Sequence, residues 1–263
     1  MNSPEDANIA DARATIFARI RKALDVDPED PSGHKVVADR LRRHPKGTVP
    51  LRARCHGEQA IARFAAHIEN QGADLSRVAT PKKAVGAIGS YLGSNNLPPR
   101  VRMGADAVLA SLPWKEAWDI ERCFGPADAS DKASLSRAVV GAAETGTLFL
   151  ISGKDNPTTL AFLPETHMVL ISAADIVGSY EEAWDRLRSV YGAGTLPRSV
   201  NLVGGPSRTA DIEQTIVRGA HGPRRLHVLI LGAKNVADQR PRERAGSLPF
   251  PAGFDYGAPH SPR

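Results

Sequence analysis

The residues best suited to chemistry begin with the segment AETGT at residues 143–147, directly before a strongly apolar stretch. Glu144 could act as a base, as a nucleophile or as a hydrogen-bond acceptor for a ligand. Thr145, Gly146 and Thr147 could shape a binding loop at the mouth of a strand. The same residues also fit a β-turn in which Glu144 is solvated and Gly146 relieves backbone strain, and spacing alone favours that turn.

A second candidate is the segment GGPSRT at residues 204–209, which follows an apolar stretch. Two glycines and a proline would turn the chain, and residues 207–218 would then form a helix with Ser207 as its N-cap. The N–H groups at such a helix start favour a phosphate or carboxylate, to which Arg208 could add a bidentate contact. A capped helix with Arg208 in solvent fits equally well. The residues expected to bind an anion are Gly205, Ser207, Arg208 and Thr209.

Two histidines complete the candidate set. His167 opens an apolar stretch and could be a ligand, a general base or a core residue bonded to a backbone carbonyl. No second histidine lies two or four positions away, so a metal site has little local support and the core interpretation is favoured. His221 lies among glycines that fit the C-cap of the preceding helix, although it could also reach a ligand site. Lys154, in a turn-rich segment, could meet an anion, but a lone lysine is more often solvated.

Motifs of several standard enzyme classes are absent. The sequence contains no GxGxxG, HExxH or GxSxG, which disfavours a dinucleotide oxidoreductase, a zincin and a standard hydrolase. Its two cysteines, Cys55 and Cys123, are far apart in the chain and form no CxxC. They exclude a disulfide scaffold and cannot supply the four thiolates of a usual iron–sulfur cluster. We therefore expect this chain to bind no metal and no cofactor of its own.

The formal net charge of +5 would allow nucleic acid or an anionic ligand as a partner. The basic residues crowd into residues 35–54 and return in the tail, without the interleaved aromatic residues that stack on single strands. Solvated flanks are therefore favoured over a nucleic-acid surface. The chain has no apolar run of membrane-spanning length, and its acidic, polar start is unlike a signal peptide. We expect a cytoplasmic protein with no membrane contact.

The hydrophobic pattern predicts the elements that would position these residues. Helical spacing covers residues 3–24, 57–71, 81–92 and 181–190. Residues 27–50 are rich in proline, glycine and charge and are predicted to be a linker or an extended arm, while residues 130–135 are predicted to be loop or short helix. The predicted strands are residues 76–79, 100–103, 138–142, 147–151, 167–171, 199–203 and 226–231.

Apolar strands alternating with helices indicate an α/β fold with a mostly parallel sheet flanked by helices. The hydrophobic fraction of 41% is sufficient for such a core. Three regions are expected. Residues 1–50 would form an N-terminal helix and a basic linker arm, residues 51–235 the α/β domain, and residues 236–263 a disordered tail rich in proline and arginine.

Taken in order, four segments resemble the consecutive motifs of the LUD domain family, in its lactate utilisation protein C branch. They are AETGTL at 143–148, LPETH at 163–167, GPSRTADIE at 205–213 and GAHGPRRLH at 219–227. The resemblance covers roughly residues 55–232 and implies a NagB/RpiA/CoA-transferase-like fold. It also implies a cluster-free component of a system that oxidises L-lactate to pyruvate, with the iron–sulfur clusters on partner subunits.

The resemblance transfers no established catalytic residue, so Glu144 and His167 are candidates only from their positions and chemistry. An independent enzyme or binding protein for an anionic metabolite is the alternative. A sugar phosphate, a CoA thioester or a folate would fit that alternative. A nucleic-acid-binding regulator that uses the basic arm is a third, disfavoured hypothesis.

Overall fold

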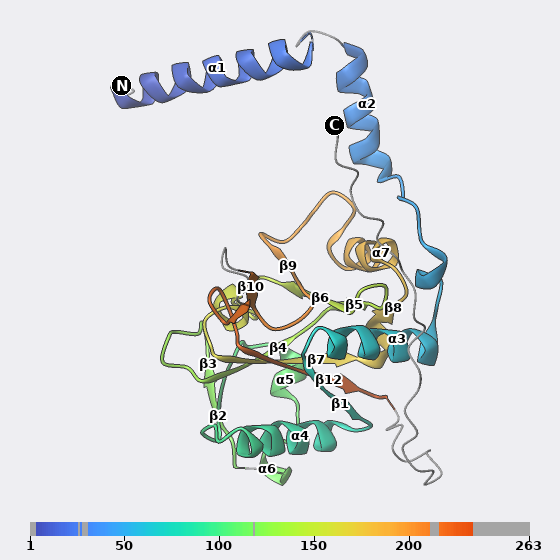
Figure 1. The fold of residues 1–263 in the computed structure, drawn as a ribbon, viewed down its shortest axis with the longest axis vertical. Coiled ribbons are helices and arrows are strands. Elements are labelled where there is room, and N and C mark those ends of the chain that lie inside the picture. Colours follow the sequence, from blue (N-terminus) through green and yellow to red (C-terminus); the bar gives the residue numbers. More distant parts are fainter. Residues whose placement is uncertain (1–3, 26, 28–30, 118, 211–215, 234–263) are drawn as a thin grey trace, which may run out of the picture.

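The structure is a computed structural model that describes residues 4–25, 27, 31–117, 119–210 and 216–233. The predicted tail at 236–263 lies outside the described residues. The first helix is confirmed as α1 (Pro4–Leu24). Together with α2 (Pro31–Arg43) it extends away from the folded body, as Figure 1 shows.

The prediction of a linker over residues 27–50 is wrong where α2 forms. Pro31 occupies the first position of this helix, where a missing N–H and a fixed φ do no harm. Further along the helix, Asp39 forms ion pairs with Arg42 at 2.6 Å and Arg43 at 2.8 Å. These i,i+3 and i,i+4 pairs are local helix-stabilising contacts, which a prediction from charge and proline content alone overlooks.

The body is built on a six-stranded, all-parallel sheet, which confirms the predicted α/β class. Its strands, in spatial order, are β1 (Asp74–Val78), β12 (Arg225–Leu231), β7 (Thr166–Ser172), β4 (Ala133–Arg137), β2 (Arg100–Met103) and β3 (Glu121–Phe124). β3 was not predicted from the sequence.

Strand β4 contradicts the prediction of loop or short helix over residues 130–135. Its serines made the segment look polar, but Ser134 and Ser136 are buried and their hydroxyls have hydrogen-bond partners inside the fold. Ser134 Oγ donates to the Leu160 carbonyl at 2.6 Å, and Ser136 Oγ lies 3.1 Å from His167 Nε2. A buried polar side chain is tolerated when it is hydrogen-bonded, and these partners are far away in sequence.

A second, four-stranded sheet covers one face of the first, as Figure 1 shows. Its order is β8 (Ile176–Val177), β5 (Val140–Ala142), β6 (Thr147–Ile151) and β9 (Val200–Val203). The β5–β6 and β6–β9 pairs are antiparallel. Three predicted strands therefore form this sheet rather than extending the parallel one. The short β5–β6 connection explains why these two strands pair antiparallel, since parallel neighbours need a crossover of a dozen or more residues.

Helices complete the layers. α3 (Gly57–Asn70) lies on the same face as the four-stranded sheet, and α7 (Tyr180–Tyr191) packs on the outer side of that sheet. α4 (Pro81–Ser94), α5 (Ala107–Ala110) and α6 (Trp114–Ala117) cover the opposite face. The remaining elements are 3-10 turns at Leu51–Ala53, Thr158–Ala161 and Ala173–Asp175, and the hairpin of β10 (Arg208–Ala210) and β11 (Ile216–Arg218).

Alternate residues of β7 point into two different cores. Val169 and Ile171 pack with Phe64 between the two sheets, while Met168 and Leu170 pack under α4. The strand is therefore apolar along most of its length, as expected for a central parallel strand buried on both faces.

We predict that Phe64→Ala lowers the free energy of unfolding by about 3–5 kcal/mol, because it leaves a cavity between the sheets. Phe64 is 0% exposed, and the matched control Phe162→Ala removes a ring that is 42% exposed. Urea unfolding of both variants is the measurement. Equal losses in the two variants would show that the contact between the sheets does not hold the fold together.

Candidate functional site

Glu144 lies in the turn between β5 and β6, at the start of α7. Its Oε2 accepts from the backbone N–H of Tyr180 at 3.3 Å, and its Oε1 lies 3.8 Å from Arg52 Nη2. The side chain is only 14% exposed. A carboxylate at a helix start is stabilised by the positive end of the helix. The structure thus gives Glu144 a positioning role at α7, and the catalytic role remains a prediction.

The two threonine hydroxyls of the same turn lie within hydrogen-bond distance of each other and of a tyrosine hydroxyl. Thr145 Oγ1 and Thr147 Oγ1 are 2.8 Å apart, and each lies within hydrogen-bond distance of the Tyr180 hydroxyl, at 3.0 and 2.7 Å. Gly146 has φ +69°, and a Cβ there would lie 2.7 Å from the Ile68 backbone nitrogen. Glycine is therefore required for the turn to pack on α3.

Gln71, the residue that follows α3, links this turn to the GGPSRT segment. Its Nε2 donates to the Thr145 carbonyl at 2.7 Å, and its own carbonyl accepts from Arg208 Nη2. Gly205 lies against the same residue, where an added Cβ would be 3.1 Å from the Gln71 carbonyl oxygen. The structure thus brings Thr145, Gly205 and Arg208 together around Gln71, a residue that no sequence signal indicated.

The predicted helix over residues 207–218 is wrong. β10 and β11 form an antiparallel hairpin there, with Arg208 opposite Arg218 and Thr209 opposite Val217. The backbone N–H of Ser207 donates to the Pro223 carbonyl at 2.8 Å. Ser207 is therefore not a helix N-cap, and no helix start is present there to favour an anion. Ligand roles for Gly205, Ser207 and Arg208 stay predictions.

The reason lies in residue type and in tertiary pairing. β-Branched residues, which are common in this stretch, lose side-chain freedom in a helix and suit paired strands. Residues 211–215 lie outside the described residues. His221 is exposed beyond the hairpin. No helix ends there, so the prediction that the glycines around it cap a helix is wrong. A ligand role for Thr209 or His221 stays a prediction.

His167 is a core residue, 1% exposed, in contact with Ser136. Burial lowers the pKa of this imidazole to about 3. Its described contacts do not include Glu144, the other catalytic candidate. This placement agrees with the core interpretation that the sequence favoured.

A second buried histidine lies under α4. His227 stacks on the Tyr91 ring with centroids 4.0 Å apart, and its Nε2 lies 2.9 Å from Ser76 Oγ. The Tyr91 hydroxyl donates to Asp74 at 2.7 Å. His227 Nδ1 is buried with no hydrogen-bond partner among the described residues. Burial lowers the pKa of His227 to about 4, because a protonated ring would be poorly solvated there.

These histidines make stability depend on pH. The unfolded chain binds protons as pH falls below about 6.5, while folded His227 stays neutral until about 4, so the free energy of unfolding should decrease in that window. We predict that His227→Gln reduces the decrease between about pH 7.5 and 5 by up to roughly 2 kcal/mol. Urea unfolding at both pH values measures it.

His221→Gln, which changes an exposed histidine, is the control for this experiment and should keep the wild-type pH dependence. An unchanged pH dependence in His227→Gln would mean that His227 has the same pKa in the folded and the unfolded chain, so that its burial does not favour the neutral ring.

The connections of the sheet diverge at the carboxyl ends of β2 and β4. After β2 the chain continues through α5 and α6 on the α4 face, whereas after β4 it passes into β5 on the opposite face. Open α/β sheets bind ligands in the crevice at such a switch point. This edge is therefore the place where topology predicts a ligand.

An ion pair stands at this edge. Arg137, the last residue of β4, donates from Nε to Asp106 Oδ2 at 2.9 Å. Asp106 Oδ1 accepts from the backbone N–H groups of Val108 and Leu109, which fixes the carboxylate at the start of α5. The Arg137 side chain is 32% exposed. A guanidinium held in this way presents a fork that suits a carboxylate or a phosphate.

The loop of residues 153–156 reaches over the end of β2. A Cβ on Gly104 would lie 2.0 Å from the Asp155 carbonyl oxygen, so only glycine permits this approach. The same loop carries Lys154, which is exposed. Sequence reasoning missed Gly104, Asp106 and Arg137, because the segment that ends in Arg137 was not recognised as a strand.

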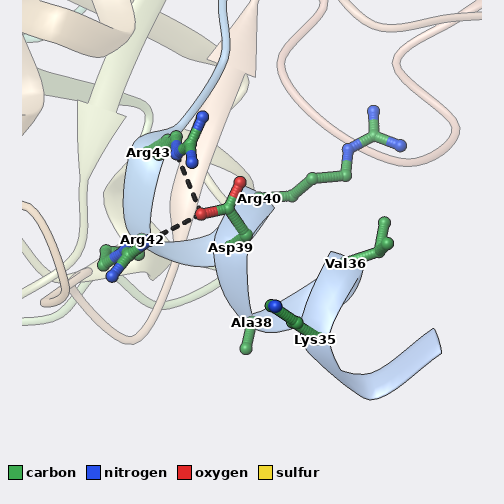
Figure 2. Close-up of a pocket in the computed structure, with 7 residues that line it drawn as sticks. All are labelled: Lys35, Val36, Ala38, Asp39, Arg40, Arg42 and Arg43. Carbon is green, nitrogen blue, oxygen red and sulfur yellow. Dashed lines mark hydrogen bonds and ion pairs between the residues drawn. The ribbon is translucent and has the colours of Figure 1, made fainter. Parts of the chain in front are cut away.

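Metal and membrane hypotheses gain no structural support. Among the described residues, no three or more His, Cys, Asp or Glu side chains are grouped closely enough to hold a metal ion. Within the same part of the chain, no helix is both long and apolar enough to cross a membrane. A hollow of about 560 Å³ runs along α2, but its described lining residues all come from that one helix, as Figure 2 shows. It is an open surface distant from the switch point.

A parallel sheet with helices on one face, and a second sheet together with α3 on the other, defines a layered α/β fold. The LUD domain matches residues 61–231. The chain belongs to the LUD domain family.

Two kinds of relative support this assignment. An uncharacterized protein of Neisseria meningitidis is 38% identical over 99 residues, 38% of this chain and 42% of that protein. The proteins named Lactate utilization protein C from Anoxybacillus flavithermus and Bacillus subtilis are 31% and 32% identical, over 43% and 40% of this chain and 51% and 45% of their own length. The chain thus spans about half the length of the curated relatives that it matches.

A solved structure supports the fold. A DUF162 family protein from Deinococcus radiodurans superposes with a TM-score of 0.51 at 23% identity, over 70% of this chain and all of that one. The similarity at this level of identity concerns the fold alone.

Proposed function

We propose that this chain is a cluster-free component of an L-lactate oxidation system that acts in the cytoplasm with iron–sulfur partner subunits. The observation that carries the proposal is the match to proteins named Lactate utilization protein C, together with membership of the LUD family. Oxidation of lactate to pyruvate releases two electrons and two protons. A chain with two cysteines cannot hold a four-thiolate cluster, which supports placing such clusters on partner subunits.

The proposal predicts a growth phenotype. A clean deletion of the gene should abolish or strongly slow growth on L-lactate as sole carbon source, and a plasmid-borne copy should restore it. Growth on pyruvate should be unaffected, because pyruvate enters metabolism after the oxidation step. Unimpaired growth on L-lactate in a strain with no other lactate dehydrogenase would refute the proposal.

The partner part of the proposal needs its own measurement. A tagged, chromosomally expressed chain, purified from cells growing on L-lactate, should carry with it proteins that contain iron and acid-labile sulfide. Cells growing on pyruvate are the control for induction. A chain that is required for growth on lactate and is still recovered without iron would keep the role in lactate use and refute the proposed iron–sulfur partners.

A second candidate function is binding of an anionic metabolite, and the Arg137–Asp106 pair at the switch point favours it. The pair is preorganised, half-buried and adjacent to the loop that carries Lys154. L-Lactate and pyruvate are themselves carboxylates, so this site is compatible with either function. Sugar phosphates, CoA thioesters and folates also carry the required anion.

Thermal unfolding with L-lactate, pyruvate, inorganic phosphate, coenzyme A and a folate tests this site. A ligand that binds the folded chain should raise Tm by mass action, and Arg137→Ala should weaken that ligand at least about tenfold, the loss of one charge-assisted contact. Arg186→Ala, which removes an ion pair with Asp175 elsewhere, is the control. A loss of binding in Arg208→Ala but not in Arg137→Ala would move the site to the GGPSRT segment.

A further inference from the structure

Residues 44–56, between α2 and α3, connect the helical arm of α1 and α2 to the body and pass beside α7, as Figure 1 shows. The LUD match begins at residue 61, so this segment and the arm lie outside the part of the chain that the family accounts for. The inner and outer halves of the segment are held to the body in different ways.

The inner half, residues 51–56, is anchored by burial. Ala53 and Cys55 are 0% and 2% exposed, and Cys55 belongs to the core between the two sheets. An added Cβ on Gly178 would collide with the carbonyl oxygens of Ala53 and Cys55, so the chain lies directly against Gly178. This half can therefore leave the body only if the core opens.

The outer half, residues 44–47, is held to α7 by charge. Lys46 Nζ lies 2.5 Å from Asp185 Oδ2. The backbone N–H of Gly47 donates to Glu181 Oε1 at 2.8 Å. Glu181 and Asp185 are four residues apart in α7, so they lie on one face of the helix. The hydrogen bond and charge of Asp185 raise the pKa of Lys46 above its ordinary value, and Glu181 adds to that effect.

Apolar packing contributes little at this place. A hollow of about 640 Å³ lies between the base of the arm and the body. Its lining on the arm side is Leu41, His44 and Pro45, and its lining on the body side includes Trp184 and Leu196. Leu41 and Leu196 remain 69% and 62% exposed. The base of the arm is therefore fixed to α7 by polar contacts beside an open hollow, without a shared core.

These polar contacts are open to solvent. The Lys46 and Asp185 side chains are 58% and 42% exposed. Exposed ion pairs are weak, and salt screens them, because the Debye length falls from about 10 Å at 0.1 M to about 3 Å at 1 M. Residues 48–50, which join the two halves, have no regular secondary structure. The arm thus has a docked position that ionic strength can shift, and a short segment about which it can turn.

We propose that Lys46 and Gly47, with Glu181 and Asp185 as their partners, form a latch that docks the arm on α7 at low ionic strength and releases it at high ionic strength. Release turns the arm about residues 48–50, while the inner half stays anchored. It also removes the arm side of the hollow. The latch therefore sets the position of α1 and α2 relative to the LUD domain without a change in that domain.

Distances between two spin labels on the full chain test the latch. The labels are attached to Val37→Cys in α2 and Val190→Cys in α7, at positions that are 57% and 59% exposed, in a chain that also carries Cys123→Ser. Cys55 is buried and stays unlabelled. The distance distribution should be narrow at about 0.05 M salt and should become broader and longer at about 1 M. A distribution that is the same at both concentrations overturns the proposal.

Charge exchange tests the ion pair of the latch. Asp185→Asn and Lys46→Glu should each shift the distribution toward the released form already at low salt. The double variant Lys46→Glu, Asp185→Lys should restore the docked form, because the pair then has opposite polarity. Asp175→Asn breaks another ion pair of α7, with Arg186, and should keep the wild-type salt response. A docked arm in Asp185→Asn, or a double variant that stays released, would contradict the latch.

Hydrogen exchange of the Gly47 amide measures the second contact. This N–H is bonded to a carboxylate in the docked state, so Glu181→Ala should speed its exchange at least about tenfold. The amide of Arg54, which donates to the Leu51 carbonyl in the inner half, should keep its rate. Equal exchange of the Gly47 amide in the wild type and in Glu181→Ala would show that the contact does not hold the arm. Circular dichroism of each variant confirms that the body is folded.

Discussion

Burial of the central strands β7 and β12 on both faces is the constraint on which the rest of the structure depends. Both strands are apolar almost throughout, so their side chains need cover on two sides. α4 supplies that cover on one face. α3 and the four-stranded sheet supply it on the other, with Phe64 between the layers. The chain must therefore cross between the faces, and this crossing creates the switch point at the ends of β2 and β4.

The same layering explains why the motif residues serve packing in this structure. The AETGT turn, the end of α3 and the β10–β11 hairpin meet where the second sheet joins the body. Gln71 bonds to two of them, Glu144 lies at the start of α7, and Gly146 lets the turn approach α3. A sequence motif can thus identify a family through residues that hold layers together, while the switch point lies at another edge of the sheet.

The Arg137–Asp106 pair and the latch offer two different kinds of interaction. The pair is a fixed cationic fork at the switch point of the domain shared by the family. The latch joins an arm outside that domain to α7 through exposed charges. The two contacts lie on separate parts of the molecule.

The sequence by itself determined the α/β class, most helices and the apolar strands, because these follow from periodicity within a few residues. It also determined that four cysteine thiolates are not available. Only the tertiary structure decided which strands share a sheet, because a short apolar strand has the same local sequence pattern in the six-stranded and in the four-stranded sheet. β4 became a strand through partners remote in sequence, which propensity does not report, whereas β10 and β11 pair only with each other. The ion pair of Arg137 with Asp106 joins residues 31 positions apart, so it exists only once the sheet has formed.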